Sequence, residues 1–312
     1  MDRKRGCLEH RMVMDLPSLL EKGTLAVFNN SRVRKARLLG VSEASGAKAE
    51  FLLLKKLDGS SWQVLAKRSK RRKPQDRYMF DDTGAEVLPA AGEDGTLALR
   101  FDRPIDDAWL DIHGHVPLPP YIRRKDTRND SERYQTVYAR EYGSAAAPTA
   151  GLHFTGELLE GLKNAGIEIA FVTLHVGLGT FLPVRTENIE EHRMHGENYI
   201  IDGESALSIE KAKAEGRKIL AVGTTSCRVL ESAWLEGRGR LKEGEGSTSI
   251  FIYPGFDFRV IDGLFTNFHT PLSTLLMLVS AFAGRDFVLD SYREAVKEGY
   301  RFFSYGDACL IL

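Results

Sequence analysis

The stretch 144–183 limits most strongly what fold this chain can adopt. It holds two loops of small residues, at 147–153 and 175–180, and each loop places a histidine beside glycines. Between the loops, a helical pattern at 157–164 leads into an apolar, β-branched run at 167–174. Glycine lets the backbone approach a ligand closely. A helix and a strand bracketed by two such loops therefore predict a pocket at the end of an α/β sheet.

The part of the chain from 38 to 116 has a different character. Short alternating segments at 48–54, 61–66 and 96–101 are separated by clusters of turn residues. Closely spaced short strands of this kind predict a small antiparallel β-barrel. Helical and strand patterns alternate again after the barrel.

We therefore predict the α/β class, with a large mixed α/β domain and an inserted small antiparallel β-barrel. The α/β catalytic domain comprises 1–37 and 117–312, and the barrel comprises 38–116. A low-complexity stretch at 236–246 is expected to be a loop. The other elements expected in the α/β domain are helices at 16–23, 204–215, 226–235, 271–283 and 285–298, and strands at 24–28, 218–222 and 249–253.

Charge and cysteine content exclude several classes of protein. Lys and Arg number 43 and Asp and Glu number 43, so any affinity for nucleic acid must come from local patches. The three cysteines lack CxxC spacing, which favours a reducing compartment over a disulfide or zinc framework. The longest apolar run, 275–283, is shorter than the ~18 residues that span a bilayer. With no signal-peptide pattern at the N-terminus, we expect a soluble cytoplasmic monomer that does not enter a membrane.

The segment Val222-Gly-Thr-Thr-Ser226 follows an apolar strand and opens a helix. Its hydroxyls and the free amides of a helix N-terminus suit a carboxylate, a phosphate or ribose hydroxyls. Simple N-capping explains the same residues. Arg228 and Glu231 lie one turn further along, where they form either a surface ion pair or a clamp for a zwitterionic ligand such as an amino acid.

Histidines occur in several of the polar loops. The Gly177-x-Gly179 pair lacks the third glycine and the following helix of a dinucleotide site, so we do not expect one. His192, His195 and Glu197 permit three interpretations: a metal site (as in a metal hydrolase), acid–base or ligand contact, or a structural cluster. Histidines spread over Gly/Thr loops, with His269 ahead of an apolar helix, suit general acid–base chemistry near neutral pH.

Two basic clusters, at 67–73 and 123–128, are either solvated faces or a stripe that contacts a phosphate backbone. Tyr121, Tyr134 and Tyr138 lie close to the second cluster in sequence and could stack an unpaired base. A non-catalytic RNA-binding module is therefore an alternative to an enzyme.

Together these motifs resemble the S-adenosylmethionine:tRNA ribosyltransferase-isomerase family of queuosine biosynthesis. The resemblance covers nearly the whole chain in order. It is carried by Leu118-Pro-Pro-Tyr-Ile122, Tyr134-Gln-Thr-Val-Tyr138, Ala146-Ala-Pro-Thr-Ala-Gly-Leu-His-Phe154, Thr173-Leu-His-Val-Gly-Leu-Gly-Thr-Phe181, His192, His195, Val222-Gly-Thr-Thr-Ser226, Ile250-Phe-Ile-Tyr-Pro-Gly255, Thr266-Asn-Phe-His269 and Tyr300-Arg-Phe-Phe-Ser-Tyr-Gly-Asp307.

The resemblance implies an α/β domain with an inserted β-barrel, and a specific reaction. The ribosyl group of S-adenosylmethionine is transferred to 7-aminomethyl-7-deazaguanine at the tRNA wobble position and isomerised, which gives epoxyqueuosine and releases adenine and methionine. The implied partners are S-adenosylmethionine as co-substrate and a tRNA with a GUN-type anticodon. No metal or further cofactor is implied.

The reaction needs a base beside the ribose C5′ and an acid near the departing adenine. Within the positions supported by the resemblance, we hypothesise that His175 or His269 is the base and that His153 or His195 is the acid. Thr224, Thr225 and Arg228 would hold the methionine carboxylate or the ribose, and Glu231 the methionine ammonium.

Further substrate contacts are expected in the same motifs, and tRNA contacts in the basic clusters. The remaining substrate-binding residues expected are Thr149, Gly151, Gly177, Gly179, Thr180, His192, Glu197 and Asn267. The tRNA-binding residues expected are Arg68, Arg71, Arg72, Arg123, Arg124 and Tyr134.

The chain departs from the family pattern at its start. Family members usually begin with a further Leu- and Pro-rich segment, and 1–6 corresponds to the stretch just after it. The alternative expectation is therefore an N-terminally incomplete member that binds tRNA with weak or no turnover.

Overall fold

The computed structural model describes residues 1–66, 72–89, 96–119, 121–122, 124, 126–177, 194 and 196–312. Within them the chain forms two compact units. One consists of Met1–Arg32, Gln135–Glu141 and Ala147–Leu312, and the other of Val33–Tyr134 and Tyr142–Ala146. The second unit is wider on both sides than the predicted insertion 38–116, because segments that flank the barrel strands in sequence are part of it.

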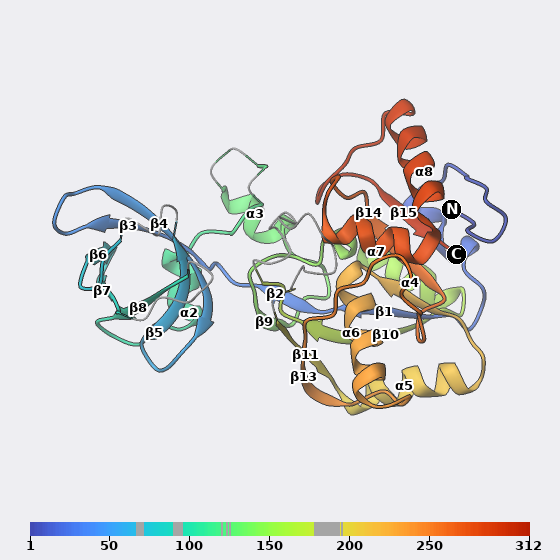
Figure 1. Cartoon of the computed structure of the whole chain (residues 1–312), viewed down its shortest axis with the longest axis horizontal. Coiled ribbons are helices and arrows are strands. Elements are labelled where there is room, and N and C mark those ends of the chain that lie inside the picture. The colour runs from blue at the N-terminus through green and yellow to red at the C-terminus, as the bar shows by residue number, and fades with distance from the viewer. Residues whose placement is uncertain are drawn as a thin grey trace. The chain divides into compact units, whose positions relative to one another are not determined.

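The first unit is built on a seven-stranded sheet with the order β13-β11-β10-β1-β12-β14-β15 (Figure 1). Strand β1 pairs in parallel with β10 and β12, and β12 pairs in parallel with β14. The outer strands β11, β13 and β15 pair antiparallel. The strands are β1 (Leu25–Asn29), β10 (Glu168–Leu174), β11 (Glu197–Ile201), β12 (Ile219–Val222), β13 (Gly244–Thr248), β14 (Gly263–Asn267) and β15 (Ala308–Ile311).

Strand β1 is buried along its whole length, as expected of a central strand covered on both faces. Ala26 and Phe28 pack on one face into a cluster with Leu158 and Leu162. Successive side chains of a strand point to opposite faces, so Leu25 and Val27 face the other side of the sheet. That side is covered by the helices α5 and α6, which contact β10 and β12.

Three helices of this unit begin at side-chain caps. Thr155, Asp202 and Ser273 each accept a hydrogen bond from a backbone N–H of the first turn of α4, α5 and α7. These side chains satisfy amides that a helix start leaves free. The helices are η1 (Val13–Asp15), α1 (Leu16–Leu19), η3 (Thr149–His153), α4 (Gly156–Asn164), α5 (Gly203–Ala214), α6 (Thr224–Glu236), α7 (Thr274–Ala283) and α8 (Arg285–Lys297).

The second unit contains a closed antiparallel barrel with the order β3-β4-β5-β8-β7-β6. Its strands alternate between buried and exposed positions, and the aromatic rings of Phe51, Tyr78, Phe80 and Phe101 fill the interior. The fold class predicted from the sequence is therefore confirmed. The barrel strands are β3 (Arg37–Ser42), β4 (Lys48–Lys56), β5 (Ser61–Ala66), β6 (Arg77–Phe80), β7 (Thr83–Val87) and β8 (Leu97–Phe101).

The flanking segments of the chain contain two helices and a two-stranded sheet. In α2 the side chain of Asp106 caps the helix by accepting from the backbone N–H of Trp109. The two helices are α2 (Asp107–His113) and α3 (Arg128–Arg133), and the sheet pairs β2 (Ser31–Val33) with β9 (Glu141–Ser144).

One predicted strand is wrong. The apolar run 249–253 forms no strand, and Ile252 is buried in irregular backbone. The strand lies just before it, as β13, within and beyond the stretch expected to be a loop. Its residues Gly244–Thr248 carry no apolar signal because β13 is a largely exposed edge strand that is held by pairing with β11.

None of the helices in the described part of the chain combines the length and the apolar character that crossing a membrane requires.

Candidate active site

The four parallel strands β10, β1, β12 and β14 end at one edge of the sheet. In parallel α/β sheets, ligands bind beyond this carboxyl edge. His175 directly follows β10, Thr224 and Thr225 follow β12, and Asn267 ends β14. Residues that are far apart in the sequence are therefore brought to one edge by strand order.

His153 ends the short helix η3 and contacts the end of β14. Its Nε2 lies 3.0 Å from the Nδ2 of Asn267. The ring of Phe265 packs edge-on against the imidazole at 5.7 Å between centroids. Burial lowers the pKa of His153, which the carboxylate of Asp307 partly offsets. His153 is therefore neutral near pH 7.

His269 lies two residues beyond Asn267. Its Nε2 is 2.9 Å from the Oγ1 of Thr266, and its backbone N–H donates to the hydroxyl of Tyr292 at 3.2 Å. Burial lowers the pKa of His269 to about 4, so the imidazole carries no charge at neutral pH. A neutral imidazole can accept a proton, as a base must.

The end of β10 is tied to the start of β11. The backbone N–H of His175 donates to the carbonyl of Asn198 at 3.1 Å. The backbone N–H of Gly177 donates to Oε1 of Glu197 at 2.9 Å. These hydrogen bonds place His175 and Gly177, which are both half-buried, beside the start of β11.

Glu197 forms a buried ion pair with Arg228 of α6. The guanidinium Nη1 donates to Oε2 of the carboxylate, and Nε lies 3.4 Å from the carbonyl oxygen of Ile250. The remaining nitrogen, Nη2, is buried and has no hydrogen-bond partner among the described residues. Arg228 thus keeps one donor available beside the carboxyl edge.

The predicted surface ion pair between Arg228 and Glu231 is wrong, because both side chains are buried and Arg228 pairs with Glu197. Glu231 instead accepts three backbone N–H groups, from Arg259, Val260 and Ile261, at 2.9 to 3.1 Å. Burial raises the pKa of the Glu231 carboxyl, and the three amides oppose that effect. Since these amides occupy both carboxylate oxygens, Glu231 anchors a loop rather than a ligand ammonium.

The start of α6 has the free amides expected of a helix N-terminus. Gly223, the N-cap residue, has φ +92° and no side chain to cap the first turn. Thr224 and Thr225 are both buried, and the Oγ1 of Thr225 has no hydrogen-bond partner among the described residues. The capping interpretation therefore does not account for Thr225, whereas Ser226 bonds back to the carbonyl of Val222 at 2.9 Å.

The loop 147–153 approaches its neighbours closely. A Cβ added to Gly151 would lie 2.0 Å from the hydroxyl oxygen of Tyr138, so only glycine fits. Gly151 is buried, which gives it a packing role whatever ligand the loop contacts. Thr149, at the start of η3, is half-buried.

The sequence analysis did not identify Asn29, at the end of β1. Its Nδ2 donates to the carbonyl of Leu174 and its Oδ1 accepts from the N–H of Leu174, both at 3.0 Å. Asn29 therefore fixes the end of β10 next to β1. Its position as a polar residue at the end of an apolar strand is the sequence signal that could have indicated Asn29.

Three of the predicted tRNA-binding residues can be placed in the second unit. The Arg72 guanidinium lies 4.8 Å from the centroid of the Phe51 ring, and Arg124 forms a bidentate pair with Asp130. The expected stacking by Tyr134 does not fit this structure, because its ring is 0 % exposed and has no free face for a base.

Seven predicted site residues lie outside the described residues, so the structure does not test their roles or the metal-site interpretation. They are Arg68, Arg71, Arg123, Gly179, Thr180, His192 and His195.

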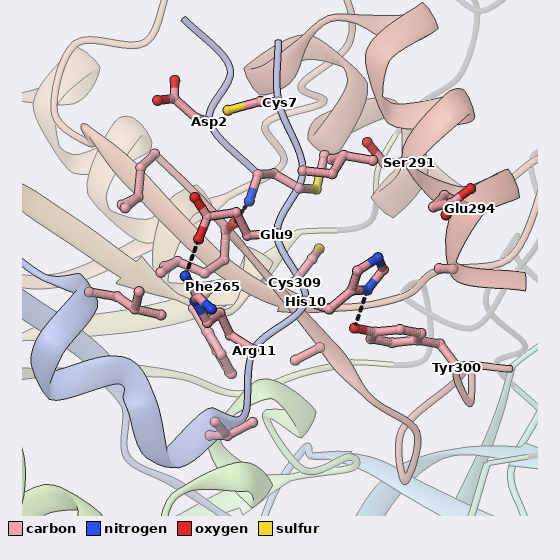
Figure 2. Close-up of a pocket in the computed structure, with 18 of the residues that line it drawn as sticks. Asp2, Cys7, Glu9, His10, Arg11, Phe265, Ser291, Glu294, Tyr300 and Cys309 are labelled. Atoms are coloured by element: carbon pink, nitrogen blue, oxygen red, sulfur yellow. Dashed lines mark hydrogen bonds and ion pairs between the residues drawn. The ribbon is translucent and has the colours of Figure 1, made fainter. Parts of the chain in front are cut away.

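Figure 2 shows a pocket of about 270 Å³ elsewhere in the first unit. Residues 1–2, 5 and 7–13 line it on one side, and Tyr300 and Cys309 are among the residues opposite. His10 Nδ1 and the Tyr300 hydroxyl lie 2.8 Å apart at its rim. None of the predicted site residues that the structure describes lines this pocket.

The fold and the carboxyl-edge site define an α/β protein with neutral, partly buried histidines, free hydroxyls and a buried arginine at the ends of parallel strands. The chain belongs to the queuosine biosynthesis protein family, whose model matches residues 1–311. Membership of this family confirms the resemblance found in the sequence motifs and gives the chain a role in queuosine biosynthesis.

Named relatives agree with this assignment. The S-adenosylmethionine:tRNA ribosyltransferase-isomerase of Treponema denticola is 56% identical, over 100% of this chain and 91% of the relative. The enzyme of the same name from Acetivibrio thermocellus is 52% identical over the same shares. The crystal structure of the S-adenosylmethionine tRNA ribosyltransferase from Thermotoga maritima is 38% identical, has a TM-score of 0.54, and is matched over 100% of this chain and 90% of that one.

Proposed function

We propose that this chain transfers the ribosyl group of S-adenosylmethionine to 7-aminomethyl-7-deazaguanine at the tRNA wobble position and isomerises it, releasing adenine and methionine. Relatives at 56% and 52% identity carry the name S-adenosylmethionine:tRNA ribosyltransferase-isomerase. The product is epoxyqueuosine-tRNA, and S-adenosylmethionine is a co-substrate rather than a resident cofactor.

The observation that carries the proposal is the position of the motif loops. His153, His175, His269 and Thr225 come from four separate motifs and lie at or beside the ends of neighbouring strands. The histidines can donate or accept a proton, and the hydroxyl of Thr225 suits a carboxylate or a ribose. The proposed reaction needs both kinds of group at one site.

The chemistry defines what these groups must do. The sulfonium acidifies the C5′ hydrogens of the ribose, so a base removes one of them. The glycosidic bond to adenine breaks while an acid protonates the departing adenine. The amine of the deazaguanine then forms a bond to the ribosyl carbon as methionine departs, and water must be excluded because hydrolysis competes.

His269 and His175 are the candidates for the base. Burial lowers the pKa of His269 to about 4, which keeps its imidazole unprotonated at neutral pH and also makes it a weak base. His153 and His195 are the candidates for the acid. Of these four, His195 is assigned on the sequence resemblance alone.

The start of α6 is the proposed site for the methionine carboxylate or the ribose. The Oγ1 of Thr225 and the Nη2 of Arg228 are buried, and no described residue hydrogen-bonds either of them. A carboxylate would satisfy both donors and would lie near the positive end of the helix dipole.

The partner is proposed to be a tRNA with a GUN-type anticodon. Arg68, Arg71, Arg72, Arg123 and Arg124 are the proposed contacts to its phosphates. We further propose that the chain acts as a monomer in the cytoplasm, and without a metal or another cofactor.

The test is to mix the chain with S-adenosylmethionine and tRNA that carries the precursor base, and to measure free adenine. We expect stoichiometric adenine and methionine, and a tRNA mass that has increased by the transferred group. The same tRNA without the aminomethyl group is the control and should release no adenine. Binding of tRNA without adenine release would favour the RNA-binding alternative, and loss of activity with EDTA would contradict the absence of a metal.

A further inference from the structure

Asn267 makes two hydrogen bonds through Nδ2, whereas its Oδ1 is buried and has no hydrogen-bond partner among the described residues. Its Nδ2 lies 3.3 Å from the carbonyl oxygen of Phe303 and 3.0 Å from Nε2 of His153. A carbonyl oxygen accepts and cannot donate, so the atom that faces Phe303 must be the amide nitrogen. The two hydrogens of Nδ2 then point to Phe303 and to His153.

The orientation of Asn267 determines the tautomer of His153. Since Nδ2 is a donor, Nε2 of the imidazole must be the acceptor, and it therefore carries no hydrogen. In a neutral imidazole the single N–H is then at Nδ1. No described residue hydrogen-bonds Nδ1 of His153, so this N–H is available to a ligand at the carboxyl edge.

The surroundings hold both partners in place. Asn267 is 2 % exposed at the end of β14. Phe265, two positions earlier in the same strand, packs its ring against His153. The charged groups that act on His153 are Asp307, which favours the imidazolium, and Arg301, which opposes it. Asp307 and Arg301 also pair with each other at 3.0 Å, which reduces the effect of either one.

We propose that Asn267 is a positioning residue that holds His153 in the Nδ1–H tautomer, so that His153 presents a hydrogen-bond donor, and not a base, to the substrate. The role of His153 as a donor to the substrate rests on the function proposed above, in which His153 faces the departing adenine. His153 keeps the Nδ1 proton and donates it in a hydrogen bond to the departing adenine, because loss of that proton from a neutral imidazole would leave an imidazolate, and Nε2 stays bonded to Asn267. The base is then His175 or His269.

The first experiment needs no turnover. Long-range ¹H–¹⁵N NMR of the ligand-free chain, labelled with ¹⁵N-histidine, reports which ring nitrogen carries the hydrogen. The resonances of His153 are identified by their loss in His153→Gln. We expect a protonated Nδ1 and an unprotonated Nε2; a protonated Nε2 would overturn the inference.

The second experiment uses Asn267→Asp, which has nearly the same shape but only acceptor oxygens. A carboxylate opposite Nε2 favours a hydrogen there, and it also favours the imidazolium. We expect the His153 tautomer to switch, its titration to move to higher pH, and adenine release to fall by roughly 10²-fold, the usual cost of losing one hydrogen-bond donor at a developing charge. Thr266→Val, which alters the neighbouring contact to His269, is the control and should leave the His153 tautomer unchanged.

The experiments distinguish failure of the positioning role of Asn267 from failure of the proposed ribosyl transfer. If the tautomer is as expected but the chain releases no adenine, the positioning role of Asn267 stands and the proposed function is wrong. If Asn267→Asp leaves the tautomer and the pH profile as in the wild type, Asn267 does not position His153. Should Asn267→Asp not fold, Asn267→Ser tests the tautomer alone, because it removes the amide donor without adding the charge that shifts the titration.

Discussion

The guanidinium of Arg228 donates to the carboxylate of Glu197, and each of these side chains is only 4 % exposed. The pair joins the first turns of α6 to the start of β11, and Glu197 also accepts the backbone N–H of Gly177. Two buried opposite charges thus connect three segments at the carboxyl edge.

Breaking this pair should destabilise the fold. We expect Glu197→Gln to lower the free energy of unfolding by about 3–5 kcal/mol, because it leaves the Arg228 charge buried without its partner. Urea unfolding measures the change. Adding Arg228→Met should recover most of the loss, since no charge is then buried. A double variant as unstable as the sum of the two single variants would show that the charge pair is not the cause.

The stability of the first unit should depend on pH through His269. Its folded pKa of about 4 is lower than the ordinary 6.5, so the unfolded chain takes up the proton first and stability falls as the pH drops from about 6.5 toward 4. From pH 7.5 to pH 5 the loss due to this residue is about 2 kcal/mol. The measurement compares unfolding of the wild type and His269→Gln at both pH values; equal losses in the two proteins would contradict it.

Gly151→Ala should be costly because the new Cβ would lie 2.0 Å from the hydroxyl oxygen of Tyr138 and 2.7 Å from Cγ2 of Thr136. We expect about 1–3 kcal/mol of lost stability, the usual cost of overpacking. Gly156→Ala is the matched control, since nothing lies within 4 Å of its added Cβ, and it should be neutral or stabilising. Thermal unfolding of both variants decides the matter, and equal melting temperatures would refute the packing argument.

Glu231→Gln separates an anchoring role from a ligand-binding role. The substitution puts an amide nitrogen opposite backbone N–H groups of 259–261, and we expect about 1–3 kcal/mol of lost stability. The affinity of the folded variant for S-adenosylmethionine, measured by calorimetry, should stay within about twofold because the side chain is buried. Unchanged stability with at least roughly tenfold weaker binding would restore the ammonium role predicted from the sequence.

Most of the secondary structure could be predicted because local patterns and tertiary structure agree. The apolar run before Asn29 forms the central strand β1, and the helices α4 to α8 lie where helical patterns occur in the sequence, three of them behind a side-chain cap. β13 could not be predicted, because its glycines and exposed polar residues form a strand only through pairing with β11.

The composition of the site could be predicted better than its pairings. Motifs placed His153, Thr225 and Asn267 in ligand loops, and the strand order brings them to one edge. The sequence suggested Glu231 as the partner of Arg228 because i, i+3 residues share a helix face. The true partner, Glu197, comes from a strand outside that helix, and no local rule connects positions so far apart.

The order of strands in the first unit has a consequence for synthesis of the chain. Leu25 of β1 pairs with Glu168 and Ile219, and β14 lies between β12 and β15. A nascent chain therefore carries its central strand without either neighbour until β10 (Glu168–Leu174) has been made. The β-barrel, whose strands are consecutive, can close first. High contact order makes such parallel sheets slow to fold, so the carboxyl edge is assembled only after Asn267 has left the ribosome.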